Sequence, residues 1–435
     1  MLSYYLKLAL RSFHRNRVLT ALMVLAIALG IGAAMTTLTV FQVLSGDPIP
    51  QKSDSLHYVR MDPRSVADYS PGDEPPSQMT RLDSETLLHE ARADRQALMS
   101  AGTVAIEPEA EGMAPFLLPA RYTSADFFAM FDTPFRSGAG WGKGEDEARA
   151  RVAVISRSLS ERLFGESDPV GRTVRLSRDD FRIVGVLDEW RPTPRFYDMT
   201  SGEFTDTEDV FLPFSTSREL RLPTQGSMGC WDENHDPEGS TGLNAPCTWV
   251  QYWVELATPA RVADYRAWLQ NYVDQQRASG RFERPAPPML TPLMDWLDEN
   301  EVVPADVRLQ VWVALGFLVV CLLNTVGLLL AKFLQRGGEI GVRRALGASR
   351  RAIFVQCLVE AGAVGLAGGA FGLLLAMLGL WAVRQQPADY AALAHMDPAM
   401  LLATFAMALV ASLVAGLLPA WRAMQVTPAI QLKSQ

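Results

Sequence analysis

The chain has 435 residues, of which 49% are hydrophobic and 20% are charged, and its formal net charge is −8. This length allows one to three domains. The apolar residues are gathered in long runs and the acidic residues in one central region. That distribution argues against a wholly soluble protein, and the acidic central region argues against a partner such as nucleic acid.

The N-terminal region combines basic and apolar residues. Residues 1–17 carry apolar side chains at helical spacing with basic residues off that face, which predicts an amphipathic helix lying on the membrane surface. Residues 18–45 follow as an apolar run, predicted as the first transmembrane helix. The alternative is a cleaved signal peptide, but the apolar part of such a signal is usually about 7–15 residues long.

Residues 46–306 are predicted to form one large external domain of mixed α/β structure. They hold 44 acidic and 26 basic residues, a net charge of −18. Alternating or β-branched segments predict strands, and apolar residues three and four apart predict helices. The strands are predicted at Arg151–Ser156, Thr173–Leu176 and Phe181–Leu187, and the helices at Ser158–Phe164 and Val262–Arg277. Pro, Gly, Asn and acidic residues crowd 191–247, which predicts loops or a loosely built subdomain.

Two cysteines of this domain, Cys230 and Cys247, lie within that polar stretch. In an oxidising compartment they are predicted to form a disulfide that closes the loop. A metal or redox pair is the alternative, although the spacing fits no standard ligand pattern.

Three further apolar runs predict transmembrane helices at residues 307–332, 355–383 and 398–420. They are joined by a loop at 333–354 and a short external connection at 384–397, and a tail follows at 421–435. The N-terminal arm, the loop and the tail are all basic, so the positive-inside rule places them and both termini in the cytoplasm. The predicted fold class is therefore an α-helical membrane protein with four transmembrane helices and a large mixed α/β periplasmic domain inserted between helices 1 and 2.

The loop between the second and third spans is too charged for a bilayer and too short for a domain. Gly337-Gly338 is predicted to let the chain leave the second span sharply. A short helix is predicted over Glu339–Leu346, with Gly347 ending it and Ser349 capping the next helix. An anchor that only fixes topology needs the arginines but not the glycine and alanine pattern around them.

The third span contains two GxxxG spacings, Gly365/Gly369 and Gly368/Gly372. They allow close helix packing, either within the chain's own bundle or at a dimer seam. Polar residues in the spans are few, namely Asn324 and Glu360, and no row of charges indicates an ion path. Glu360 is expected to be hydrated at the interface or to pair with Arg350 or Arg351.

Enzymatic motifs are missing from the sequence. It contains no G-x-x-x-x-G-K-[ST] phosphate-binding loop, no pair of histidines at zinc-binding spacing, and no glycines of a nucleophile elbow around Ser156-Arg157-Ser158. The acidic pairs Asp179-Asp180, Asp188-Glu189 and Glu208-Asp209 are interpreted as solvated turns. The chain is predicted to be non-catalytic, with no metal site.

The loop sequence resembles a family hallmark. The segment Glu339-Ile340-Gly341-Val342-Arg343-Arg344-Ala345-Leu346-Gly347-Ala348 is similar to the signature of FtsX-like permeases of ABC transporters. The tail from Pro419 to Lys433 resembles the end of that family. Upstream segments resemble the MacB-type periplasmic core domain, and these are Thr123–Phe128, Val152–Ser156, Leu163–Gly165, Asp168–Thr173 and Ile183–Leu187.

This resemblance implies a coupling helix that seats in a groove of a separate ATPase subunit, with two permease chains and two ATPase chains in the working unit. ATP and Mg would bind to the ATPase, and this chain would bind no cofactor. MacB carries a fused ATPase domain, whereas no phosphate-binding loop occurs here, so a partner ATPase is required. A periplasmic adaptor is a further expected partner.

The leading hypothesis is a permease subunit of the bacterial inner membrane that transmits ATPase motion to its periplasmic domain, for efflux of a periplasmic substrate. A second hypothesis is an FtsX-like regulator that acts on a periplasmic enzyme such as a cell-wall hydrolase. A third, a membrane-anchored receptor or enzyme, leaves the loop unexplained.

Overall fold

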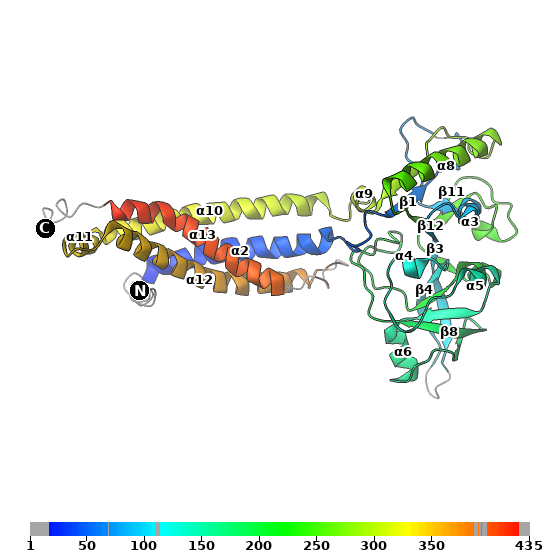
Figure 1. The fold of residues 1–435 in the computed structure, drawn as a ribbon, viewed down its shortest axis with the longest axis horizontal. Helices are drawn as coiled ribbons and strands as arrows, with labels where there is room; N and C mark the ends of the chain where they lie inside the picture. The colour runs from blue at the N-terminus through cyan, green and yellow to red at the C-terminus, as the bar shows by residue number, and fades with distance from the viewer. Residues whose placement is uncertain are drawn as a thin grey trace. The chain divides into compact units, whose positions relative to one another are not determined.

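The fold is taken from a computed structural model, which describes residues 17–67, 69–108, 114–386, 390, 393 and 398–425 (Figure 1). The chain divides into two compact units. One contains residues 1–45 and 303–435, and the other contains residues 46–302. Residues 1–16 of the predicted surface helix and most of the predicted tail fall outside the described residues, and Arg17 is the first residue of the first long helix.

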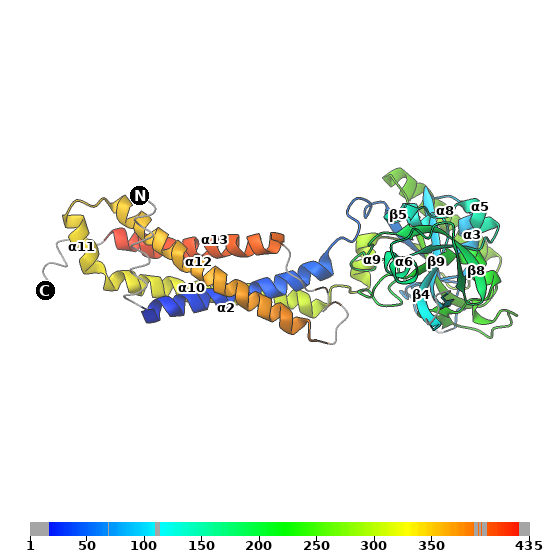
Figure 2. The same ribbon diagram turned by 90° about the horizontal axis from the view of Figure 1, so that it is seen from below.

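The first unit is a helical bundle. Its long helices within the described ranges are α2 (Arg17–Ser45), α10 (Ala305–Gln335), α12 (Arg350–Val383) and α13 (Pro398–Met424). All four are long and apolar enough to cross a membrane, since helices of this length at 1.5 Å per residue exceed about 30 Å of hydrocarbon. Helix α2 packs against α10 and α12, and α13 packs against α12 and α10 (Figure 2).

The glycines of α12 provide close contacts inside this bundle. A Cβ added to Gly368 would lie 2.6 Å from Ile27 of α2, and one added to Gly369 would lie 2.6 Å from Ala408 of α13. Similar crowding occurs at the other two residues of the GxxxG pairs, Gly365 and Gly372. These glycines therefore serve packing between helices of one chain, and none is left open for a second chain.

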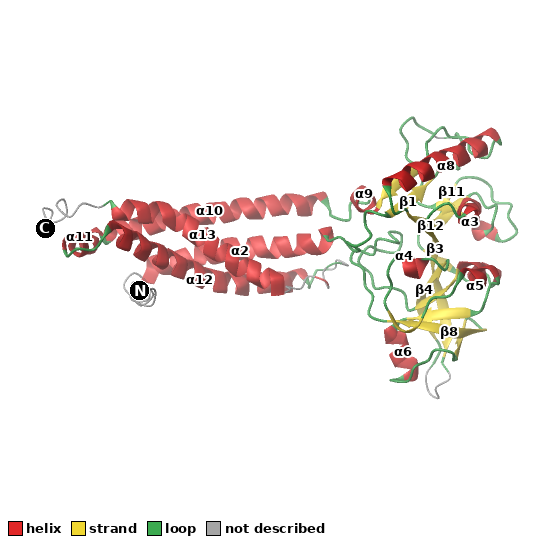
Figure 3. Ribbon diagram, viewed as in Figure 1, coloured by secondary structure: helices red, strands yellow, loops and turns green. Residues whose placement is uncertain are grey.

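The second unit is a mixed α/β domain built on a sheet (Figure 3). Hydrogen-bonded neighbours run in the order β13-β1-β12-β3-β4-β9-β6-β8-β5, with four short strands beside this path. The strands are β1 (Leu56–Arg60), β2 (Met79–Thr80), β3 (Arg95–Glu107), β4 (Phe116–Thr123), β5 (Phe135–Gly138), β6 (Val152–Ile155), β7 (Thr173–Leu176), β8 (Asp179–Leu187), β9 (Val210–Pro213), β10 (Thr224–Gln225), β11 (Gly229–Cys230), β12 (Cys247–Glu255) and β13 (Met289–Pro292). The β4–β9 and β6–β8 pairs are parallel, and the other pairs are antiparallel.

The domain also contains helices. They are α3 (Arg81–Glu90), α4 (Phe127–Met130), α5 (Lys143–Glu147), α6 (Arg157–Phe164), α7 (Phe214–Glu219), η1 (Gly239–Thr241), α8 (Pro259–Ala278) and α9 (Leu293–Glu299). The predicted strand–helix unit around residues 151–164 and the helix around 262–277 are both confirmed. Helix α8 buries Tyr265, Leu269 and Tyr272, the apolar positions that predicted it, in the domain's core.

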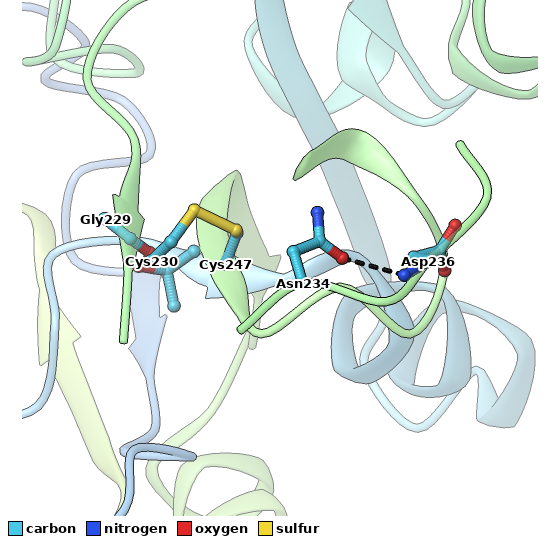
Figure 4. The surroundings of a disulfide bond; sticks show 6 residues. Gly229, Cys230, Asn234, Asp236 and Cys247 are labelled. Atoms are coloured by element: carbon cyan, nitrogen blue, oxygen red, sulfur yellow. Dashed lines mark hydrogen bonds between the residues drawn. A yellow bond between two sulfur atoms is a disulfide. The ribbon is translucent and has the colours of Figure 1, made fainter. Parts of the chain in front are cut away.

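The interpretation of residues 191–247 as loops or a loosely built subdomain is wrong in part. Strand β9 lies inside the sheet between β4 and β6, and all four of its residues are buried. The polar end of the segment folds against β12, where Cys230 and Cys247 are joined in a disulfide (Figure 4). Next to it, the side chain of Asn234 accepts a hydrogen bond from the backbone N–H of Asp236.

Glu208 is also not in a solvated turn. Its carboxylate is buried and pairs with Arg121 of β4, whose guanidinium is 0% exposed and also pairs with Asp198 at 2.6 Å. Arg195 lies 3.3 Å from Glu208, and the Tyr197 hydroxyl donates to Glu208 at 2.8 Å. Buried carboxylates need such cationic and hydrogen-bonding partners, because an isolated charge is costly in a protein interior. This cluster therefore fixes residues 195–208 to the sheet.

Candidate functional site

The loop between α10 and α12 contains one short helix, α11 (Gly337–Ala345). Gly337 and Gly338 lie inside this helix with no left-handed φ, so the prediction that they form the sharp exit is wrong. The change of direction occurs at Arg336, with φ −98° and ψ 12°.

The other end of α11 follows the predicted pattern. Gly347 has φ +101°, a conformation that favours glycine. Its N–H bonds to the carbonyl of Arg344, and the N–H of Ala348 bonds to that of Arg343, which closes the helix as a Schellman motif. The side chain of Ser349 then accepts from the N–H of Ala352 at 3.1 Å and caps α12. The helix is thus held in a defined position between two spans.

A buried ionic network lies where α10, α11 and α12 meet. Glu360 of α12 is 3% exposed and Lys332 of α10 is 0% exposed, and the Lys332 Nζ lies 2.7 Å from the Glu360 carboxylate. Arg336 approaches the same carboxylate at 3.1 Å, and Lys332 also donates to Thr20 of α2 at 3.3 Å. The expected pairing of Glu360 with Arg350 or Arg351 is therefore wrong. The partners come from the preceding span, whose end lies beside the start of α12.

The charged side chains of α11 continue this network. The Glu339 carboxylate pairs with Arg336 at 3.3 Å and with Arg343 at 2.7 Å. The Arg343 guanidinium also donates to the side-chain oxygen of Gln356 in α12 at 3.0 Å, and Arg344 donates to the carbonyl of Met424 in α13 at 3.4 Å. Both arginines of the predicted coupling segment thus contact the chain's own spans.

The opposite side of α11 is exposed and apolar. Val342 is 53% exposed and Leu346, directly after the helix, is 83% exposed. Ala345 and Gly347 are exposed beside them, whereas Ile340 and Gly341 are buried against the bundle. We call Val342, Ala345, Leu346 and Gly347 the outer face of α11. Exposed apolar side chains that lie together are typical of interaction sites.

Lys332, Arg336 and Gln356 were not singled out as site residues from the sequence. One signal in the sequence could have found the two basic residues. Charged residues inside membrane spans usually pair with one another, so a glutamate in one span needs a cation from a neighbouring helix. Lys332 is the last residue of the second span as predicted from the sequence.

Other candidate positions are structural in the described residues. Ser156 caps α6 by accepting from the N–H of Leu159, and Asp209 accepts from the Ser156 hydroxyl. Among the residues that the structure describes, no three His, Cys, Asp or Glu side chains converge as a set of metal ligands.

The fold is that of a polytopic membrane protein with a large extramembrane domain. It has four apolar helices, a domain inserted after the first of them, and a short helix between the second and third. Residues 20–272 match the MacB-like periplasmic core domain, and residues 311–428 match the FtsX-like permease C-terminal domain. The chain therefore belongs to the family of ABC-transporter permeases with a MacB-like periplasmic core domain. This membership and the apolar helices identify an inner-membrane protein whose inserted domain is periplasmic.

Among curated proteins, the chain is similar to the pyoverdine export ATP-binding/permease protein PvdT of Pseudomonas syringae pv. syringae. The two are 27% identical over 319 residues, which is 71% of this chain and 42% of the relative. The macrolide export ATP-binding/permease protein MacB of Marinobacter nauticus is 24% identical and is matched over 99% of this chain and 60% of its own length. The chain thus spans about half the length of these relatives.

Among solved structures, the periplasmic region of MacB from Actinobacillus actinomycetemcomitans matches with 13% identity and a TM-score of 0.35, covering 58% of this chain and 94% of that one. The extracellular domain of the transporter YknZ from Gram-positive bacteria matches with 12% identity and a TM-score of 0.34, covering 54% of this chain and 97% of that one.

Proposed function

We propose that this chain is the transmembrane subunit of an ABC exporter, in which a separate ATPase subunit drives conformational change of the periplasmic domain. Family membership supports the permease role, and the names of the relatives PvdT and MacB refer to export. ATP and Mg are proposed to bind outside these 435 residues, which contain no phosphate-binding loop. The basic arm, loop and tail support cytoplasmic termini.

The observation that carries this proposal is the outer face of α11. Fully burying a leucine side chain contributes about 1.5–3 kcal/mol, so leaving Leu346 in water forgoes that contribution unless a partner covers it. Charged side chains of α11 are occupied within the chain, so contact with an ATPase groove depends mainly on apolar packing by Val342 and Leu346. The proposed coupling role of Glu339–Ala348 therefore divides into an outer contact face and an inner attachment.

The contacts of α11 with the bundle explain how a displacement of α11 would be transmitted to the spans. Arg336 and Glu339 connect α11 to α10, and Gln356 and Glu360 connect it to α12. Because these contacts are short and partly buried, the helix is expected to move together with both spans. Helices α2 and α10 are continuous in sequence with the two ends of the periplasmic domain, so their motion is passed to it.

A second permease chain is proposed to pack on α10. Asn324 lies within this span and is exposed, with no hydrogen bond from its side chain to any described residue. Gly316 and Gly327 on the same helix have no neighbouring atom within 4 Å of an added Cβ. Small residues and a polar side chain on an open helix face are typical of helix–helix interfaces in membranes. This face replaces the GxxxG glycines of α12 as the proposed dimer seam.

Reconstitution with the cognate ATPase tests the proposal. Leu346→Ala is expected to lower permease-stimulated ATP hydrolysis by about tenfold, since roughly 1.5 kcal/mol of apolar contact is lost. Leu334→Ala is the matched control, because Leu334 is also an exposed leucine but lies on α10. Equal stimulation by wild type and the Leu346→Ala variant would contradict the coupling role.

A further inference from the structure

The periplasmic domain contains a cavity of about 690 Å³ between α3, α5 and α7. Ligand-binding cavities of small molecules typically measure about 300–1,000 Å³. Its lining is unusually polar, and the basic side chains that line it are Arg81, Lys143, Arg149 and Arg218. Whether the cavity favours a ligand depends on which of these charges are already paired.

Arg218 of α7 is the deepest of these cations. It is 6% exposed, yet no carboxylate of a described residue lies within 4 Å of its guanidinium. Nη2 donates to the carbonyl of Leu222 at 2.8 Å, and Nε donates to the Ser217 hydroxyl at 3.3 Å. The third nitrogen, Nη1, has no hydrogen-bond partner among the described residues. A buried charge without a counterion is costly, so this guanidinium differs from an ordinary core arginine.

Aromatic rings hold Arg218 in place. Its guanidinium carbon lies 5.2 Å from the centroid of Trp249, 5.6 Å from that of Tyr122 and 5.8 Å from that of Phe214. Such cation–π contacts orient the group without neutralising it. Burial lowers the pKa of Arg218 to about 10, so the side chain remains cationic at neutral pH.

Most of the other charges around the cavity are paired. Arg81 contacts Glu85 at 2.7 Å and Glu238 at 2.8 Å, and Lys143 lies 3.3 Å from Asp126. Glu219 pairs with Arg151 at 3.2 Å.

Arg149 and Glu147 are the exceptions. Both are exposed, and among the described residues neither has an ion-pair partner. Asp146 is a third exception: it is half-buried and has no ion-pair partner among the described residues, its two oxygens accept from the N–H groups of Ala125 and Trp141, and burial raises its pKa to about 6. Of the lining charges without an ion-pair partner among the described residues, Arg218 is the most deeply buried, and the others are mixed in sign.

We propose that this cavity binds a small anionic molecule, whose carboxylate or phosphate group pairs with the Nη1 side of Arg218 while Arg149 approaches it from the mouth. Guanidinium groups suit both anions, because they present parallel N–H donors to two oxygens. The site lies within the periplasmic domain and goes beyond the proposed coupling role. It requires no ATPase, so failure of one proposal leaves the other untouched.

Calorimetric titration of the full chain in lipid nanodiscs, without nucleotide, tests the site. Inorganic phosphate and succinate are the two probes, and the tighter one identifies which anion the cavity prefers. Arg218→Gln is expected to weaken binding by about tenfold or more, the usual effect of losing a hydrogen bond to a charged group. Arg221→Gln is the matched control, because Arg221 is exposed and does not line the cavity.

A second pair of variants keeps the test decisive if Arg218→Gln unfolds the domain. Arg149→Gln is expected to weaken anion binding a few-fold, and Glu147→Gln to strengthen it by a similar factor, since both charges are exposed. The proposal is overturned if neither probe binds the wild type. It is also overturned if folded Arg218→Gln binds as tightly as Arg221→Gln, or if the Arg149 and Glu147 variants fail to shift affinity in opposite directions.

Discussion

Buried ion pairs occur in both units of the molecule, and they hold different kinds of structure. In the periplasmic domain, Arg121 is enclosed by Asp198 and Glu208 and fixes a loop segment to the sheet. In the membrane bundle, Glu360 binds Lys332 and Arg336 and holds α11, whose outer face is left open. The first cluster is buried in the domain, whereas the second lies beside the exposed outer face of α11. This difference accords with a structural role for the first cluster and with the proposed coupling role for the second.

The largest effect is expected from breaking the domain cluster. Arg121→Ala removes the cation between two buried carboxylates, and leaving such charges uncompensated costs about 5 kcal/mol of the domain's unfolding free energy. Denaturant unfolding followed by tryptophan fluorescence measures this loss. Arg136→Ala removes an exposed pair with Glu161 and is expected to cost less than about 1 kcal/mol. Similar losses in both variants would show that the cluster is not a structural lock.

Breaking the ionic network around Glu360 is expected to cost less stability than breaking the Arg121 cluster. Its effect on coupling to the ATPase is expected to be larger. Glu360→Ala leaves Lys332 and Arg336 without this carboxylate, which costs about 3 kcal/mol of bundle stability. Thermal unfolding in detergent measures that cost, and ATPase stimulation measures coupling. Glu339→Ala affects a partly exposed carboxylate and serves as the milder control. Full stimulation by a folded Glu360→Ala variant would contradict the transmitting role of the network.

The smallest of these effects is a pH dependence of the domain. Asp146 has a folded pKa of about 6, while an unfolded aspartate titrates near 3.9. Its ionised form is therefore penalised in the folded state above pH 6, and stability is regained as the pH falls from about 6 to 4. Between pH 6 and pH 4, the free energy of unfolding is expected to rise by about 2 kcal/mol more in the wild type than in Asp146→Asn.

Comparison of wild type with Asp146→Asn separates this contribution from that of His57. Burial lowers the pKa of His57. The contribution of His57 to the free energy of unfolding therefore falls as the pH is lowered, in the direction opposite to that of Asp146. Identical pH profiles of unfolding for the two proteins would show that Asp146 does not titrate in this range.

The sequence was sufficient to predict features that depend on local patterns. The spans are visible because charges are missing over about 20 residues, and α8 because its aromatic residues recur at helical spacing. Gly347 and Ser349 end and begin helices as their backbone chemistry requires. These features need no knowledge of distant neighbours.

Features that depend on tertiary partners were missed or assigned wrongly. Glu208 looked like part of an exposed acidic turn because Arg121 lies 87 residues away. Glu360 was matched with the nearest arginines in sequence, but its partners lie on the previous span. Strand β9 is only four residues long and is stabilised by strands on both sides, so its own composition carries little signal.

The orientation of α11 is the central claim, and site-specific crosslinking tests it most directly. A cysteine introduced at Leu346 is accessible to reagents, whereas the native Cys321 and Cys357 are buried and Cys230 and Cys247 are joined to each other. In the assembled complex, a bifunctional reagent is expected to link position 346 to the ATPase and not to link a cysteine placed at buried Ile340. Crosslinking from position 340 with none from position 346 would contradict this orientation.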